Sequence, residues 1–101
     1  MRSGDVQRVL SDGQPLAGRR VIMFLAPGTG GFSTVASRRV GGAVDRNRAR
    51  RILRAAWREV APAVGGNHDV VLVARTGVRG AKTQNVVDEM TQLLARWGFK
   101  P

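Results

Sequence analysis

Arginine dominates one short stretch of the chain and gives it the chemistry of a phosphate-binding surface. Residues 46–58 hold six arginines in thirteen positions, RNRARRILRAAWR. The planar guanidinium group donates paired hydrogen bonds to phosphate oxygens and stacks on bases. This density of guanidinium groups favours a nucleic acid, and an RNA backbone in particular, as the partner of the segment.

The same stretch has the apolar spacing of an amphipathic helix. Its apolar residues form one helical stripe, namely Ala49, Ile52, Leu53, Ala56, Trp57 and Val60. The complementary positions carry Asn47, Arg50, Arg51, Arg54 and Arg58. Arg46 and Arg48 lie in the first turn, where we expect both to face solvent, and Asp45 precedes them as a helix cap. The pattern predicts a helix that starts near residue 46, with one face in a core and the other cationic.

A charged helix face can also be merely solvated. A solubilising face would normally intersperse acidic residues, because like charges four residues apart repel one another. This face has no acidic residue before Glu59. The composition therefore favours a binding surface.

Length and charge describe one small, strongly basic domain. The 101 residues suffice for a single domain, 1–101, with one modest core. The formal charge is +10, and residues 38–58 alone hold eight arginines against Asp45, a net charge of +7. The concentration of positive charge in one segment indicates a nucleic-acid contact more strongly than the total charge of the chain does.

Several classes of protein are disfavoured by what the sequence lacks. Without cysteine, neither a disulfide framework nor a thiolate metal site can form. No apolar run approaches the roughly 20 residues of a membrane span, and residues 1–20 lack the apolar core of a signal peptide. We therefore expect a soluble, cytoplasmic protein that needs neither a membrane nor a protein partner.

The sequence also groups no side chains for catalysis. His68 is the only histidine, and we predict it to be a loop residue, because a transition-metal site would need further ligands. The Asp and Glu residues lack the spacing of a catalytic carboxylate pair. A serine nucleophile needs a neighbouring base, and His68 is the only imidazole that could serve as one. Residues 28–31, GTGG, lack the Lys-Ser/Thr of a phosphate loop, so we predict a hairpin turn there. We expect no catalytic residues and no metal ligands in the protein.

Apolar runs predict the strands on either side of the arginine helix. Residues 21–25 predict a buried strand, and residues 32–40 should return beside it after the turn. Residues 70–74 predict a further strand after the helix. Since a strand, helix, strand succession needs a crossover, the two strands flanking the helix should be parallel.

Two more helices are predicted at the ends of the chain. Residues 5–10 have helical apolar spacing before a turn, and residues 83–97 form a longer amphipathic pattern. Trp57 and Trp97 both lie on apolar stripes, so we expect both to be core residues. The result is a small sheet covered by helices.

Residues 37–54, SRRVGGAVDRNRARRILR, resemble the signature of the protein subunit of bacterial ribonuclease P. That family typically has a Ser-Lys-Lys-Val-Gly-Asn-Ala-Val stretch followed by an Arg-Asn-Arg helix. Residues 69–75, DVVLVAR, are similar to its late strand, and the order of elements matches over nearly the whole chain. This ordered match is far more specific than a basic patch.

The resemblance implies a fold and a function. The fold would be α+β, a two-layer α/β sandwich of order αβββαβα, with a left-handed βαβ crossover around the arginine-rich helix instead of the usual right-handed one. The protein would join a large catalytic RNA, and the complex would hydrolyse one phosphodiester bond to remove the 5′ leader of precursor tRNA. Mg²⁺, bound mainly by the RNA, would carry the chemistry, while the protein would screen repulsion between the two RNAs and hold the leader.

The resemblance also implies site residues. Those that would contact the catalytic RNA are Arg46, Asn47, Arg48, Arg50, Arg51 and Arg54. The family's leader-binding cleft lies between this helix and the sheet, so the leader would be held by Ser37, Arg38, Arg39 and the exposed face of residues 32–36.

This chain departs from the family at two expected stacking positions in the cleft. Val6 stands where the family usually has a Phe in its first helix, and Thr34 stands where it usually has a Phe in the sheet. Aromatic platforms strengthen single-strand binding. We therefore expect the leader to be bound more weakly, or differently, than in the family.

Two other classes stay open on the residues alone. One is a general structured-RNA-binding or ribosome-associated protein without ribonuclease P activity, which the match over residues 37–54 disfavours. The other is a DNA-binding protein that inserts residues 46–60 into a major groove. That class needs a helix-turn-helix partner or a dimer seam, and the preceding segment is predicted to be a strand.

Overall fold

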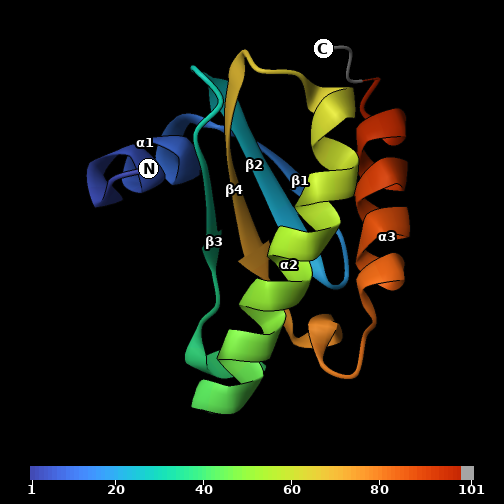
Figure 1. The fold of residues 1–101 in the computed structure, drawn as a ribbon. Coiled ribbons are helices and arrows are strands. Elements are labelled where there is room, and N and C mark those ends of the chain that lie inside the picture. Colours follow the sequence, from blue (N-terminus) through green and yellow to red (C-terminus); the bar gives the residue numbers. More distant parts are fainter. Residues whose placement is uncertain (99–101) are drawn as a thin grey trace.

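The apolar runs of the sequence assemble into one mixed sheet with helices on both faces, in a computed structural model that describes residues 1–98 (Figure 1). The elements in chain order are α1 (Ser3–Asp12), β1 (Gln14–Ala17), β2 (Val21–Pro27), β3 (Phe32–Val35), η1 (Arg38–Val40), α2 (Ala43–Val64), β4 (His68–Ala74), η2 (Thr76–Val78) and α3 (Thr83–Arg96). Here η marks a short 3₁₀ helix. Without the two 3₁₀ helices, the order of helices and strands is αβββαβα, as the resemblance implied.

The strands lie in the order β1-β2-β4-β3, and β4 is antiparallel to β2 but parallel to β3. The predicted parallel pairing of the strands flanking the arginine helix is therefore confirmed. In Figure 1 the chain runs down β3, climbs through α2 in front of the sheet and runs down β4, to the right of β3. That path is a left-handed crossover, as the resemblance implied.

The predicted pairing of the strand at residues 21–25 with the strand that follows it is wrong. Strand β4 lies between β2 and β3, so residues 28–31 do not form a hairpin turn but pass the start of β4. The third strand also ends at Val35 rather than 40, because the chain turns into η1, where the Ser37 hydroxyl accepts the Arg39 N–H at 3.3 Å. His68, predicted to be a loop residue, is the first residue of β4 and pairs with Pro27.

A buried carboxylate holds the loop between β2 and β3 in place. Asp69 accepts the backbone N–H groups of Gly31 at 2.8 Å and Thr29 at 3.1 Å, and it pairs with the guanidinium of Arg8 from α1. The Gly31 hydrogen bond, with those from Thr29 and Arg8, holds the pKa of Asp69 below its ordinary value, although burial acts in the opposite direction. One side chain thus joins α1, the loop and β4.

Two apolar clusters cover the two faces of the sheet. Helices α2 and α3 pack over one face, where Leu16, Met23, Leu53, Leu72 and Met90 are almost completely buried. Helix α1 covers part of the other face through Val9, which packs with Ala26 and Val71. The arginine helix is therefore fixed from beneath by the larger core.

The two tryptophans have different environments. Trp57 packs against the core and stacks on Phe32 of β3, with ring centroids 5.2 Å apart. Trp97 is 56% exposed, so the prediction of a core residue is wrong there. The reason is that α3 ends at Arg96 and Trp97 lies just beyond it.

The helix ends also differ from prediction. Helix α2 starts at Ala43 with Gly42 at its N-cap, so Asp45 lies in the first turn and makes no side-chain cap. Its carboxylate still favours the positive end of the helix dipole. Helix α1 is longer than the predicted 5–10, and the short strand β1 had no signal in the apolar pattern. No helix among residues 1–98 is long and apolar enough to cross a membrane.

Candidate RNA interface

Helix α2 separates its two kinds of side chain as the spacing predicts. Ala49, Ile52, Leu53, Ala56 and Val60 are buried in the core. On the opposite side, four polar residues are exposed, namely Asn47, Arg51, Arg54 and Arg58, while Arg46, Arg48 and Arg50 are half-buried. We call these seven residues the α2 ridge.

Arg48 has a structural contact that the sequence did not reveal. Its guanidinium donates to the carbonyl oxygen of Ala81 at 2.6 Å, which joins α2 to the segment before α3. The expectation that Arg46 and Arg48 both face solvent is therefore wrong for Arg48, whose guanidinium is held by Ala81, while Arg46 is half-buried. Replacing Arg48 would disturb the fold as well as the ridge.

A hydrogen bond between two residues of the ridge orients their side chains in the first turns of α2. The guanidinium of Arg50 donates to the Asn47 side-chain oxygen at 3.2 Å. An arginine already held by a neighbour loses less side-chain freedom when it meets a phosphate. The pair therefore presents donors in a partly fixed arrangement.

No carboxylate of residues 1–98 forms an ion pair with the arginines of the ridge. Across residues 1–98 the ion pairs are Arg8 with Asp69 and Arg20 with Glu89, and neither involves α2. Six arginines therefore share one helix without a carboxylate partner. Such a concentration of one sign of charge raises the local potential and attracts a polyanion. A merely solvated face would be expected to hold intrahelical ion pairs.

Sequence reasoning missed one cation beside the ridge. Lys82, which follows η2, lines a hollow of about 440 Å³ together with Arg48 and Arg51. More than thirty positions separate Lys82 from Arg48, so no local pattern could link them. The basic surface thus extends from α2 toward the start of α3.

The predicted leader residues do not all lie together. Ser37, Arg38 and Arg39 are exposed just after β3. Thr34 is paired with Leu72 and so faces α2, whereas Val6 packs on the opposite face of the sheet, with α1. The sheet places Val6 and Thr34 on opposite sides, so one cleft cannot contain both side chains.

The space between α2 and the sheet is filled by the core, including the stacked rings of Phe32 and Trp57. A half-buried apolar strip lies on the other face instead. It is formed by Val6, Leu10, Phe24, Val35 and Val73. The η1 arginines follow this strip directly, since Val35 is the last residue of β3.

Comparison with known proteins identifies the family. Residues 1–98 match the family described as Ribonuclease P. The chain belongs to the ribonuclease P protein family. It is 38% identical over 97 residues to the ribonuclease P protein component of Chloroflexus aurantiacus, which covers 92% of this chain and 72% of that protein. It is 31% identical over 100 residues to that of Syntrophomonas wolfei, covering 96% of this chain and 84% of that protein.

Solved ribonuclease P proteins have the same fold. The protein from Thermotoga maritima matches with a TM-score of 0.77 and 20% identity, over 95% of this chain and 94% of that chain. The protein from Staphylococcus aureus matches with a TM-score of 0.75 and 21% identity, over 94% and 90%. The α+β fold is thus that of ribonuclease P proteins.

Family membership determines the function. The chain is the protein subunit of ribonuclease P, the ribonucleoprotein that matures the 5′ ends of tRNA, and it associates with the ribonuclease P RNA. It takes part in an endoribonuclease as an accessory subunit. The general RNA-binding and DNA-binding alternatives are therefore set aside.

Proposed function

We propose that the α2 ridge is the surface that holds the catalytic RNA. The observation that carries this proposal is the absence of carboxylate partners for its arginines among residues 1–98. Guanidinium forks on an exposed helix face can pair with successive phosphates of a folded RNA. The ridge residues assigned to this contact are Arg46, Asn47, Arg48, Arg50, Arg51, Arg54 and Arg58.

Salt dependence tests this proposal. Binding of the catalytic RNA should weaken steeply as salt rises, because each neutralised phosphate contributes about 0.7 to 0.9 to the log–log slope. The four exposed ridge positions include three arginines, so we expect them alone to contribute a slope of about 2 to 3. Filter binding over a series of KCl concentrations measures the slope, and a flat response would rule out the ridge as the main contact.

We further propose that the 5′ leader of precursor tRNA lies along the apolar strip on the α1 face. The strip offers half-buried apolar side chains to bases, and Arg38 and Arg39 stand at its end to meet phosphates. Phe24 is the aromatic residue of the strip, and neither Val6 nor Thr34 supplies a ring. In this arrangement Val6 borders the leader and Ser37 lies beside the two arginines, whereas Thr34 lies on the α2 face and makes no contact with the leader.

Replacing Phe24 with Leu should weaken leader binding selectively. Stacking of a base on an aromatic ring is worth about 1 to 3 kcal/mol, so we expect a loss of roughly ten-fold in affinity for precursor tRNA with a leader. Affinity for mature tRNA should not change. The comparison of the two substrates on the assembled ribonucleoprotein is the measurement, and an equal loss for both would contradict the role of Phe24.

We propose that the Mg²⁺ ions of the reaction are bound mainly by the RNA. Among residues 1–98 no three His, Asp or Glu side chains gather as a ligand set, which supports this division. Such ions supply activation of water and stabilisation of the leaving oxygen. The protein's own residues bind and orient the two RNAs and reduce the repulsion between them.

A further inference from the structure

A groove away from the α2 ridge contains a second group of arginines. It has a volume of about 800 Å³ and lies where the β1–β2 turn, η2 and one side of α3 meet. None of its lining residues belongs to α2. The charged and amide side chains that matter for its chemistry are Arg19, Arg20, Arg75, Asn85, Glu89 and Arg96.

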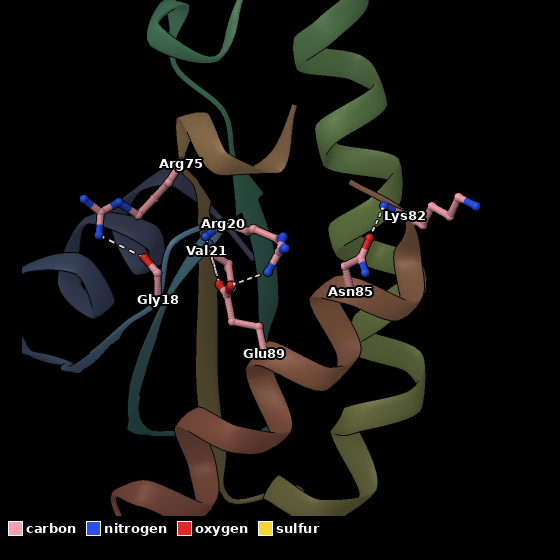
Figure 2. Close-up of polar contacts among 7 residues, drawn as sticks. All are labelled: Gly18, Arg20, Val21, Arg75, Lys82, Asn85 and Glu89. Atoms are coloured by element: carbon pink, nitrogen blue, oxygen red, sulfur yellow. Dashed lines mark hydrogen bonds and ion pairs between the residues drawn. The ribbon is translucent and has the colours of Figure 1, made fainter. Parts of the chain in front are cut away.

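One of these arginines is already neutralised. The half-buried carboxylate of Glu89 accepts the backbone N–H groups of Arg20 at 2.9 Å and Val21 at 3.1 Å (Figure 2). It also accepts the Arg20 guanidinium at 3.1 Å. This pair fixes α3 to the start of β2 and contributes no net charge to the groove.

The remaining charges make the groove cationic. Arg19, Arg75 and Arg96 are exposed and form no ion pair with any carboxylate of residues 1–98. The one further acid of the groove is Asp88, which accepts the Gln84 amide at 2.9 Å. Three guanidinium groups therefore face one carboxylate, a balance that favours an anion.

Two donors of the groove are held in place before any ligand arrives. The Arg75 guanidinium donates to the carbonyl oxygen of Gly18 at 2.9 Å, as Figure 2 shows, and keeps its other N–H groups for a ligand. The Asn85 side-chain oxygen accepts the Lys82 N–H at 2.9 Å, which leaves its amide N–H₂ as the free end. Fixed donors lose less entropy on binding.

The β1–β2 turn and η2 are packed closely at the floor of the groove, where the Arg75 N–H donates to the carbonyl oxygen of Arg20 at 2.9 Å. A Cβ atom at Gly77 would lie 2.4 Å from the carbonyl oxygen of Arg19, so the backbones touch where a side chain has no room. Arg19 and Arg75 therefore project from two segments whose spacing is fixed. Arg96 approaches from α3.

We propose that this groove binds a phosphodiester group of an RNA strand through Arg19, Arg75 and Arg96. The choice of RNA as the source of the phosphate rests on the function proposed above. With the α2 ridge engaged elsewhere, the protein would hold RNA at two separate places. The strand in the groove is either part of the catalytic RNA or part of precursor tRNA, and the same phosphate chemistry serves both.

The test compares the double variant Arg19→Gln with Arg96→Gln against the matched variant Arg19→Lys with Arg96→Lys. Both side chains are exposed and form no ion pair with a carboxylate of residues 1–98, so the fold should persist, as thermal melting will verify. The glutamine variant should lower the salt slope of binding by about 0.7 to 0.9, the value for one phosphate. The lysine variant should keep most of the slope.

Two binding assays separate the sources of the phosphate. A lowered slope for the catalytic RNA alone assigns the groove to that RNA, and a lowered slope only for precursor tRNA on the assembled complex assigns it to the substrate. Unchanged slopes in both assays would overturn the proposal. A ridge variant, Arg51→Glu with Arg54→Glu, is measured in parallel. Weaker RNA binding by this variant with unchanged slopes for the groove variant would contradict the groove proposal alone, and wild-type binding by the ridge variant would contradict the role of α2 as well.

Discussion

Reversing three exposed arginines of the α2 ridge, Arg51→Glu, Arg54→Glu and Arg58→Glu, is expected to lower affinity for the catalytic RNA by ~100-fold or more. Hydrogen bonds to charged groups contribute about 1.5 to 3 kcal/mol each, so the loss of even two contacts reaches that range. All three side chains are exposed and form no ion pair within residues 1–98. Titration of labelled RNA with the variant measures the effect.

A matched variant separates the effect of the positive charge from the effect of the planar guanidinium group. Replacing the same three residues with Lys keeps the charge but removes the planar fork, so a smaller loss, of the order of ten-fold, is expected. Arg48 is left intact because its hydrogen bond to Ala81 supports the fold. Wild-type affinity in a folded Glu variant would show that the RNA binds elsewhere.

Replacing Asp69 with Asn is expected to lower the free energy of unfolding at pH 7 by about 2 to 4 kcal/mol, because a buried, charge-assisted network loses its negative charge and one of its two acceptor oxygens. The amide that replaces the carboxylate would bring an N–H₂ group toward donors from Gly31, Thr29 or Arg8. Urea unfolding followed by circular dichroism measures the difference between the two proteins.

The same contact should make stability depend on pH. Since the folded state lowers the pKa of Asp69, its contribution is fully present above the unfolded pKa of about 3.9 and is lost as pH falls through the lower folded value. The difference between the wild-type protein and Asp69→Asn should therefore shrink below about pH 4. A difference that stays constant down to pH 2 would contradict the assigned role of the carboxylate.

The elements with strong periodic signals could be predicted from sequence. The stripe from Ala49 to Val60 fixed which side of α2 is buried, and the run at residues 70–74 marked the centre of β4. The need for a crossover then predicted the parallel pair correctly. In each case local spacing carries the information, because one repeat decides which face is apolar.

Features that depend on distant contacts could not be predicted in this way. The place of β4 between β2 and β3 is stabilised by Asp69, whose partners at Gly31 and Thr29 are about forty residues away. The contact from Arg48 to Ala81 likewise joins segments with no common pattern. Sequence neighbours suggested a hairpin for residues 28–31 because glycine-rich turns are common in hairpins.

In the candidate site, too, some features follow from local spacing and others depend on the tertiary structure. The cationic face of α2 followed from spacing, and the catalytic RNA followed from the resemblance of residues 37–54. The face of the sheet on which Thr34 lies required the strand register, since a shift of one residue reverses every side chain. The face against which Val6 packs required the position of α1. Lys82 and the groove around Arg75 depend on the tertiary structure alone.

The most direct test of the central claim is cleavage of a 5′-extended precursor tRNA at low Mg²⁺ by a bacterial ribonuclease P RNA. Three reactions are compared, with no protein, with the wild-type protein and with the ridge variant Arg51→Glu, Arg54→Glu, Arg58→Glu. We predict accurate cleavage with the wild-type protein, and cleavage with the ridge variant no faster than with RNA alone. Equal rates for the wild-type protein and the folded variant would contradict the claim that the α2 ridge holds the catalytic RNA.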